Sequence, residues 1–467
     1  MPNTLEENVN RVKAAKTAIA NAITAKGGTV SSGDGLEDFA SDIATIPSGG
    51  GSSAEKKDVN FYDYDGVIVN SYTAAEFAEL TAMPSNPSHD GLTSQGWNWS
   101  LSDAKTYVAA NGRLNIGQMY ASNTTDGKTY LHIRLSEGRL KPYLGLTGNS
   151  SGTAVSIDWG DGSTAESVTL NASTIYTPHE YASDGGYVIS IAVTNGTISL
   201  DSTSNSTNLF RKSNSADLNY DKVYANILTK AEIGTGVTSI GYYAFAYCSS
   251  LTSITIPSTV TSIGSQTFYY CYSLTSIAIP STVTSIGDSA FNSCYSLTSI
   301  TIPSTITSIG DNTFAYCSSL TSIAIPSSVT SIGSQTFYNC YSLTSIAIPS
   351  TVTSIGNSAL QSCSSLTSIT IPSTVTSIGS NTYNNCFSLT SITIPSSVTS
   401  IGTKAFYYEY GLAYIKFSST TPPTVSASNA WFNIPTDCII YVPTGSLSDY
   451  TSANYYPSSS TYTYVEY

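Results

Sequence analysis

The chain has 467 residues, enough for several domains, but only 10% of them are charged and the formal net charge is −13. No Lys or Arg lies between Lys230 and Lys404, and the only acidic residues in Gly234–Thr403 are Asp288 and Asp311. A segment this neutral lacks the electrostatic footprint that nucleic acid, heparin or an anionic membrane requires, and no stretch is long and apolar enough to cross a bilayer, so we expect no nucleic-acid partner and no membrane insertion.

Residues 1–47 are predicted to form a helical attachment segment, followed by a Gly/Ser-rich linker at 48–57. Apolar residues fall near heptad spacing in two runs, at Val9, Val12, Ile19 and Ile23, and at Leu36, Phe39, Ile43 and Ile46. Because helices this short are not stable alone, we expect them to dock on a partner or on copies of themselves, or to pack as a hairpin on their own chain. The N-terminus has no apolar core of a signal peptide, so we expect synthesis in a cytoplasm and release by another route.

Residues 58–145 are predicted to form a small α/β spacer domain. Asn60–Val69 is typical of a strand, a turn and a second strand, and Tyr130–Leu135 alternates as a strand does. Two segments have the pattern of capped helices: Thr73–Leu80, with Thr73 as the cap, and Leu101–Ala110, with Ser100 or Ser102 as the cap.

Asp63-Tyr64-Asp65-Gly66 resembles the nucleophile loop of haloacid-dehalogenase phosphatases. That chemistry needs a nucleophilic Asp, an acid/base Asp, a distant Lys and further carboxylates for Mg²⁺. The family also needs a doubly wound parallel sheet, for which a segment of this length has no room. We therefore interpret the motif as a β-turn in a hairpin.

Residues 146–227 are predicted to hold a small β-sandwich, over 146–200. The run Ile157–Ser163, reading IDWGDGS, is followed by His179-Glu180-Tyr181-Ala182 and by Gly186–Ile189. These motifs resemble a PKD-type domain, although Asp158-Trp159 stands where that family has Asp-Phe. The resemblance implies a spacer or binding module on extracellular proteins. Asp158 and Asp161 are either Ca²⁺ ligands or turn formers, and the Gly-rich hairpin favours turns.

Residues 228–417 repeat one 23-residue unit, so the fold class is mainly β, with a solenoid of about eight coils. The period is marked by cysteines, at Cys248, Cys271, Cys294, Cys317, Cys340, Cys363 and Cys386. Within one unit, Ile254 and Ile256 are predicted to form a short strand with one buried face, and Val260 and Ile263 a second extended leg. Gly264 is predicted to make a turn with positive φ. Equivalent strands then stack in parallel.

This unit resembles the BspA-type leucine-rich repeat, with the pattern L-x-x-I-x-I-P-x-x-V-x-x-I-G-x-x-A-F-x-x-C. It departs from the pattern at Leu360 and Tyr383, which replace the Phe, and at Glu409, which replaces the Cys. Residues 418–467 resemble the end cap of the family, with a short helix around Ser446–Tyr455. The resemblance implies surface display and adhesion, and it does not imply catalysis.

Eight cysteines raise the possibility of disulfides or a metal site. Seven of them keep the coil spacing, and His89, His132 and His179 all lie outside the solenoid. We therefore predict a buried column of small apolar side chains, no metal and no cofactor.

Variation between the units gathers around the Cys, where tyrosines and asparagines are interleaved. Rigid amphipathic rings with adaptable polar groups are typical of antibody-like binding surfaces, and they also suit sugars. The predicted ligand-binding residues are Tyr247, Tyr269, Tyr270, Tyr272, Tyr295, Tyr316, Tyr338, Tyr341, Asn339, Asn385, Tyr408 and Tyr410. The alternative is that these rings merely cover the solenoid.

Residues 1–47 and the segments after them, from Val59 to Phe77 and from Gly96 to Val108, resemble tail proteins of phages and prophages of Gram-positive gut bacteria. The resemblance implies a non-enzymatic tail fibre or receptor-binding protein in the virion tail. Residues 1–47 would bind tail or baseplate proteins, and the solenoid would bind a host-surface glycan or protein. A homotrimer is one assembly that the resemblance allows.

Three alternatives use the same solenoid. The first is a bacterial or eukaryotic cell-surface adhesin of the repeat family. The second is a glycan-cleaving enzyme, which needs two close carboxylates and would have to use Asp288 and Asp311, on adjacent coils. The third is ice binding by the Thr/Ser ladder, which Ala278, Ala324 and Ala347 interrupt.

Overall fold

A computed structural model describes residues 58–63, 67–88, 92–111, 114–122, 126–136, 139–200, 209–212 and 224–467. Lys57–Tyr467 form one compact unit. The helices and the linker predicted for 1–57 therefore lie outside the described residues. Within the described ranges, no helix has the length and apolar character needed to cross a membrane.

The first described segment, 58–122, is a four-stranded sheet with two helices; the hairpin strands and both helices are predicted, whereas the two strands at Leu92–Trp97 and Leu114–Ser122 are not. The strand order is β2-β1-β4-β3, and the elements are β1 (Val59–Tyr62), β2 (Ile68–Tyr72), α3 (Ala74–Glu79), β3 (Leu92–Trp97), α4 (Leu101–Asn111) and β4 (Leu114–Ser122). The Thr73 hydroxyl accepts the N–H of Glu76, and the Glu76 carboxylate accepts that of Thr73, which is a capping box. Ser100 caps α4 by accepting the N–H of Asp103. We call this segment the side module.

The motif Asp63-Tyr64-Asp65-Gly66 joins β1 to β2, which pair antiparallel. The N–H of Asp63 donates to the Val67 carbonyl at 2.8 Å, which closes the hairpin. Residues 64–66 lie outside the described ranges. The antiparallel pairing agrees with a hairpin turn and differs from the strand-to-helix loop of the phosphatases.

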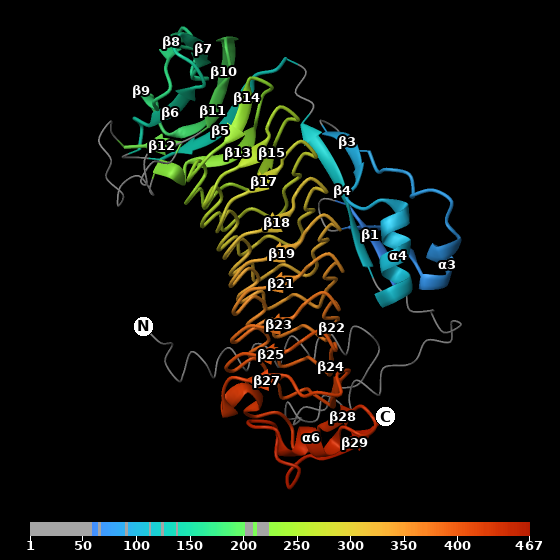
Figure 1. Ribbon diagram of the computed structural model, residues 1–467. Coiled ribbons are helices and arrows are strands. Elements are labelled where there is room, and N and C mark those ends of the chain that lie inside the picture. Colours follow the sequence, from blue (N-terminus) through green and yellow to red (C-terminus); the bar gives the residue numbers. More distant parts are fainter. Residues whose placement is uncertain are drawn as a thin grey trace, which may run out of the picture. The chain divides into compact units, whose positions relative to one another are not determined.

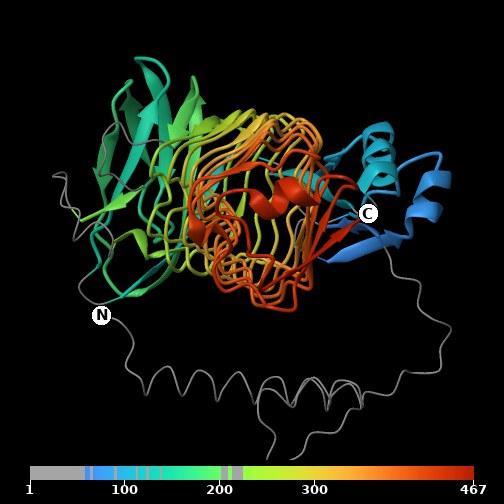
Figure 2. The same cartoon turned by 60° about the horizontal axis from the view of Figure 1, so that its bottom comes forward.

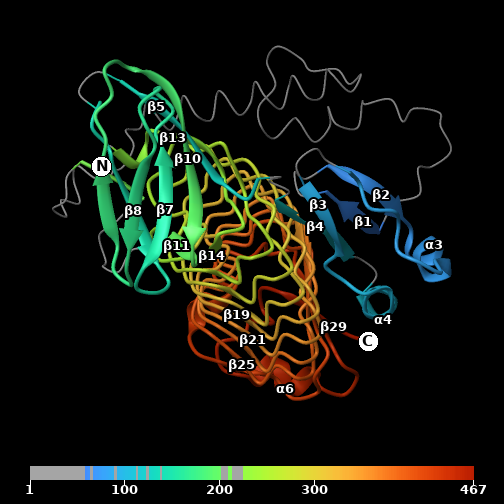
Figure 3. The ribbon, with the colours of Figure 1, turned by 90° about the horizontal axis from the view of Figure 1, so that it is seen from above.

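The sandwich supplies the N-terminal cap of the solenoid (Figure 3). Its strands are β5 (Thr129–Leu135), β6 (Tyr143–Gly148), β7 (Thr153–Asp158), β8 (Glu166–Leu170), β9 (Ile175–Pro178), β10 (Gly185–Asn195), β11 (Ile198–Leu200) and β12 (Phe210–Arg211). β5 comes before residue 146, yet it pairs with β10 of the sandwich and with β13 (Leu228–Glu232) of the first coil. β11 pairs with β14 (Val237–Ile240) of the same coil. Both sheets of the sandwich thus run directly into the solenoid and cover its first strands.

Successive coils stack in parallel with a constant offset of one repeat, as predicted (Figure 1). One leg holds β14 (Val237–Ile240), β16 (Ser262–Ile263), β17 (Ser285–Ile286), β18 (Ser308–Ile309), β19 (Ser331–Ile332), β21 (Ser354–Ile355), β23 (Ser377–Ile378), β25 (Ser400–Ile401) and β27 (Thr424–Val425). The other leg holds β13 (Leu228–Glu232), β15 (Ser253–Thr255), β20 (Ser345–Ile346), β22 (Ser368–Ile369), β24 (Ser391–Ile394), β26 (Tyr414–Phe417), β28 (Ile439–Val442) and β29 (Thr463–Glu466).

The core is built from columns of equivalent side chains. Phe268 stacks on Phe291 with ring centroids 5.2 Å apart, and Phe406 stacks on Trp431 of the cap at 4.8 Å. All eight cysteines are buried and free, and the Cys271 thiol donates to the Phe245 carbonyl at 3.1 Å, a bond that recurs in the coils down to Cys386. The predicted cysteine column is therefore present, and burial raises the pKa of the Cys317 thiol to about 12.

Each coil turns between its Ile-Gly pair and its cysteine, and we call this turn the corner. Residues other than glycine adopt left-handed backbone there. The predicted positive φ at Gly264 is wrong, because each coil instead places two other residues there, such as Gln266 at 56° and Tyr270 at 63°. The glycine is needed for a different reason. A Cβ on Gly356 would lie 2.4 Å from the backbone N of Ser334 in the preceding coil. Close approach of backbones therefore fixes glycine at this position.

The C-terminal cap closes the last coil with a 3-10 turn (Ser428–Trp431), helix α6 (Leu447–Ser452) and strands β28 and β29 (Figure 2). The helix predicted around Ser446–Tyr455 is present but shorter. The 3-10 turn extends the corner pattern, because the N–H of Tyr408 donates to the Phe432 carbonyl just as earlier corners bond to the next coil.

We expect Gly356→Ala to lower the free energy of unfolding by about 2 kcal/mol, because the new methyl group would force two coils apart. Gly186→Ala is the matched control, since the nearest atom to its new Cβ is 3.9 Å away. Urea unfolding of both variants measures the difference, and equal stabilities would contradict the close-approach argument.

Glu409 occupies the cysteine column, where burial raises the pKa of its carboxyl to about 8. The folded protein then keeps a proton that the unfolded chain loses above its own pKa near 4.5. The free energy of unfolding should therefore fall as pH rises from about 4.5 to about 8. Glu409→Cys, which restores the residue of the other coils, should abolish this fall in urea unfolding at about pH 5 and pH 8. An unchanged pH dependence would show that Glu409 is not its source.

Candidate functional site

The residue directly after each cysteine points outward and forms the outer column of the corner. Tyr272 and Tyr295 are each 40% exposed and stack with ring centroids 4.9 Å apart at 6°. Phe387 and Tyr410 stack at 5.7 Å and are also exposed. Tyr341 is 46% exposed and lies between these pairs in the sequence of coils, with serines in the coils on either side of it. We call this outer column, Tyr272, Tyr295, Tyr341, Phe387 and Tyr410, the corner edge.

The residue directly before each cysteine has a different role, because its backbone holds the corner. Tyr270 has φ 63° and donates its N–H to the Asn292 carbonyl of the next coil at 3.0 Å. The same conformation and bond direction recur at Tyr247, Tyr316, Asn339, Asn385 and Tyr408. Of these predicted ligand residues, Tyr316 is exposed and Asn339 is buried, while the others are half-buried. The structure thus places Asn339 out of reach of a ligand.

Rings one position further back pack on their neighbours. Tyr269 lies against Tyr270 at 4.2 Å, and Tyr338 lies edge-on to Tyr316 at 5.3 Å. Burial raises the pKa of Tyr269 and of Tyr316 above the ordinary value near 10. The alternative that rings merely cover the solenoid fits the half-buried Tyr269 and Tyr338, whereas Tyr316 and the corner edge remain exposed.

The two acids of the solenoid act on the corner backbone. An Asp288 carboxylate oxygen accepts the N–H of Asp311 at 3.0 Å, and an Asp311 oxygen accepts the N–H of Ser334 at 2.6 Å. Asn357 accepts the N–H of Ser380 in the same way at 2.8 Å. Since the neutral amide of Asn357 accepts the same backbone N–H, holding the corner is sufficient to account for Asp288 and Asp311 at these positions.

The sandwich acids also form turns. Asp158 accepts the N–H of Gly160, and Asp161 accepts the N–H of Ser163, both at 3.0 Å. Asp161 also contacts the His179 ring at 2.7 Å, and these hydrogen bonds hold the pKa of its carboxyl well below its usual range. In the part of the chain that the structure describes, no group of three His, Cys, Asp or Glu side chains could hold a metal ion.

In the middle coils, the leg that continues β15 and β20 is covered by the side module, a contact that sequence reasoning missed. Asn98 donates to the carbonyls of Ile302 and Ala324, Trp99 to that of Ile325 and Tyr107 to that of Ile348, all at 2.9–3.2 Å. The signal in the sequence was the alanine that replaces threonine on this face, at Ala278, Ala324 and Ala347, since Ala347 packs on the core of the side module. A smaller residue leaves room for the docked module.

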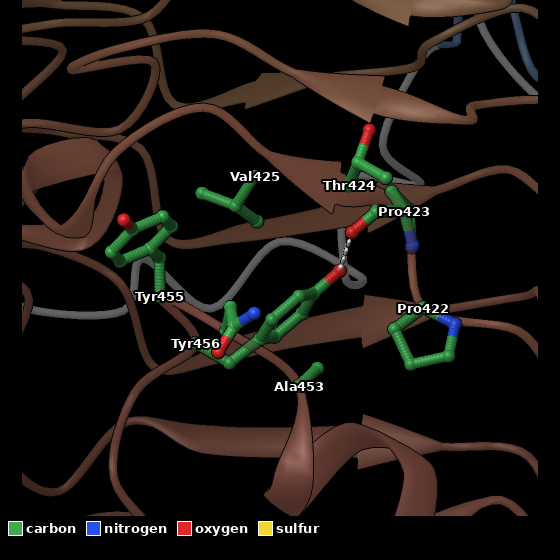
Figure 4. A pocket seen from close by; sticks show the side chains of 8 residues that line it. Pro422, Pro423, Thr424, Val425, Ala453, Tyr455 and Tyr456 are labelled. Carbon is green, nitrogen blue, oxygen red and sulfur yellow. Dashed lines mark hydrogen bonds between the residues drawn. The ribbon is translucent and has the colours of Figure 1, made fainter.

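The cap contains two hollows that were also missed. One, of about 280 Å³, is lined by Pro422, Pro423, Val425 and Tyr456 among others (Figure 4). The other, of about 380 Å³, is lined by residues that include Trp431, Phe432, Asn433, Tyr455 and Tyr462. The signal was the triplet Trp431-Phe432-Asn433, which follows Phe406-Tyr407-Tyr408 by 25 residues and thus repeats the corner with a small insertion.

Residues 217–343 and 307–433 match the family model described as a BspA type leucine rich repeat region, in six copies. A comparison with curated proteins gave no match. The family match thus covers the solenoid and the start of the cap.

Among solved structures, the chain is similar to a leucine rich cell surface protein of Faecalibacterium prausnitzii A2-165, with 26% identity over 56% of this chain and 94% of that one, and a TM-score of 0.28. It is also similar to a leucine rich repeat protein of T. pallidum, with 21% identity over 49% and 84% of the two chains and a TM-score of 0.29. A leucine-rich repeat protein of Bacteroides ovatus ATCC 8483 has 21% identity over 67% and 98%, with a TM-score of 0.28. Because these TM-scores are low, the family match and the repeat geometry, and not the solved structures, identify the solenoid as a leucine-rich repeat region.

Because the corner edge is exposed, we expect Tyr272→Ala with Tyr295→Ala to change the free energy of unfolding by less than about 1 kcal/mol. Phe291→Ala in the buried column of the same coils should cost about 3–5 kcal/mol. Urea unfolding compares the two. A large loss in the double variant would mean that the outer rings support the fold.

Proposed function

We propose that this chain, whose residues 217–433 form a BspA-type leucine-rich repeat region, is a non-enzymatic adhesion protein that binds a neutral glycan on a cell surface through its corner edge. The observation that carries the proposal is the pair Tyr272 and Tyr295, two stacked rings that are each 40% exposed. Burying large rings in water-free contacts is the main source of binding energy at such surfaces, so exposed stacked rings mark a surface for contact.

The chemistry of the corner favours a sugar over a charged ligand. No Lys or Arg lies between Lys230 and Lys404, so an acidic polymer would find no ion pair along the coils. Ring faces pack against the apolar face of a pyranose, and neutral tyrosine and serine hydroxyls match its hydroxyl groups. Rings repeated from coil to coil also fit a ligand that repeats along its own length.

The same proposal gives Asp288 and Asp311, the two acids of the coils, a structural role and no catalytic role. Asp288 and Asp311 are engaged by backbone N–H groups of the following coils, at 3.0 Å and 2.6 Å. A glycosidase needs one carboxylic acid and one carboxylate aimed at the scissile bond. Acids committed to holding corners support a binding role.

Two biological contexts fit this surface. The repeat family favours a cell-surface adhesin. The resemblance of residues 1–47 and parts of 58–122 to tail proteins favours a tail fibre or receptor-binding protein of a phage, attached to tail or baseplate proteins through residues 1–47, with a homotrimer as one assembly that this context allows. The PKD-like interpretation of the sandwich is likewise a proposal, in which it spaces and caps the solenoid. Antibody labelling of intact cells and of purified phage particles distinguishes the two contexts.

We expect the labelled full chain to bind gut bacterial cells strain-selectively, and periodate oxidation of the surface sugars to abolish this binding. A triple variant, Tyr272→Ala, Tyr295→Ala and Tyr341→Ala, should bind at least about tenfold more weakly, because three ring contacts of about 0.5–1.5 kcal/mol each are lost.

Tyr414→Ala is the matched control, since Tyr414 is 38% exposed but lies on β26, outside the corner edge. Binding that survives both oxidation and the triple variant, or that protease treatment of the cells removes, would refute a glycan bound at the corner edge.

A further inference from the structure

The corner edge does not end at the last coil but leads into the larger hollow of the cap. Phe432 stacks on Tyr407 with ring centroids 5.1 Å apart and is 49% exposed. Tyr408 lies 6.1 Å from Phe432 and 5.7 Å from Tyr410. A continuous path of rings therefore connects the exposed pair Phe387 and Tyr410 with the wall of the hollow.

Tyr455 also lines the larger hollow and is held in a costly conformation. Its φ is 65°, and the residue is 53% exposed. Asn433, at 61°, continues the left-handed corner positions, which leaves Tyr455 as the one non-glycine residue in the described ranges with positive φ outside that series. Left-handed backbone costs an ordinary residue about 1–2 kcal/mol. Such strain persists where the surroundings enforce it, and it clusters at binding sites.

The neighbour of Tyr455 shows how that position is enforced. Tyr456 turns into the cap, where its hydroxyl donates to the Pro423 carbonyl at 2.8 Å (Figure 4). Its ring packs against Trp431 and Tyr450, at 6.0 Å and 5.5 Å between centroids. With Tyr456 anchored, the adjacent Tyr455 projects to the surface beside both hollows.

The lining of the larger hollow is aromatic and neutral. It contains the rings of Trp431, Phe432, Tyr455 and Tyr462, the polar side chains of Asn433 and Thr436, and no charged residue. Trp431 is 5% exposed, and its indole N–H has no hydrogen-bond partner in the described part of the chain. A volume of about 380 Å³ lies within the range of small-ligand pockets.

We propose that this hollow, lined by Phe432 and Tyr455, binds one pyranose unit at the end of a neutral glycan whose preceding units lie along the corner edge. The inference rests on the proposed glycan-binding function and adds its end site. Exposed rings in the lining can pack against a sugar ring, and the neutral lining costs no charge desolvation. A proline-rich peptide would also suit aromatic walls, and the test treats it as the competing outcome.

The test uses saturation-transfer NMR with the full chain and a set of defined probes. These are the methyl glycosides of glucose, galactose, mannose and N-acetylglucosamine, their neutral trisaccharides, and a proline-rich decapeptide. We expect at least one trisaccharide to bind, and its affinity to fall at least about tenfold in Tyr455→Gly and in Phe432→Ala. Glycine suits the φ of 65°, so Tyr455→Gly removes the ring without adding strain.

Tyr455→Phe, which keeps the ring, should bind like the original chain, and so should Tyr414→Ala as a control for exposed tyrosine. Thermal unfolding of each variant checks that the cap is intact, and Tyr455→Phe reports on the site even if Phe432→Ala unfolds the cap. Sugar binding that is weakened as much in Tyr455→Phe as in Tyr455→Gly would mean that the hydroxyl, and not the ring face, is the contact.

The outcomes separate this inference from the proposed function. Loss of affinity in the hollow variants alone supports the end site and refutes binding along the corner edge. Loss in the corner-edge triple variant alone supports the proposed function and overturns the end site. Binding of the peptide with no sugar bound, or of no probe at all, overturns the end site as well.

Discussion

The structure depends on one constraint: neighbouring coils must approach to a single strand spacing along both legs and around the corner at the same time. Parallel hydrogen bonds set this spacing, and the corner glycine permits it, because any side chain on Gly356 would meet the backbone of the preceding coil. Since each coil packs on two others of the same shape, a departure in one coil is felt in its neighbours. This explains why the repeat is so regular, and why Glu409 enters the cysteine column only in the last coil.

The same constraint decides which side chains can meet a ligand. The residue before each cysteine gives its N–H to the next coil, as Tyr270 does to Asn292, and its side chain lies against neighbouring rings. The residue after the cysteine bonds to the next coil through its carbonyl instead, as Tyr272 does with the N–H of Ser296, and its side chain points outward. Outward rings in neighbouring coils, such as Tyr272 and Tyr295, create an aromatic edge.

Elements outside the coils cover part of the solenoid surface and so reduce the area that a ligand can reach. The side module donates hydrogen bonds from Asn98, Trp99 and Tyr107 to backbone carbonyls of the middle coils, on the leg that holds β15 and β20. The sandwich covers the first strands of the solenoid. The corner edge and the C-terminal cap lie outside both of these covered surfaces. In the cap, the last corner, at Trp431, Phe432 and Asn433, lines a hollow.

The period of 23 residues determined the solenoid, its parallel stacking and the buried cysteine column, because identical units can bury their apolar faces only by stacking. The caps of α3 and α4 and the hairpin around Asp63 followed from local rules about side chains and backbone. Tertiary structure decided the rest. The spacing could not tell that Asn339 is buried while Tyr341 is exposed, since both lie beside Cys340 and only the left-handed backbone at Asn339 separates them. Nor could it place Asn98 against Ala324, or Tyr455 and Phe432 in the lining of one hollow, because the approach of distant segments depends on how whole elements pack.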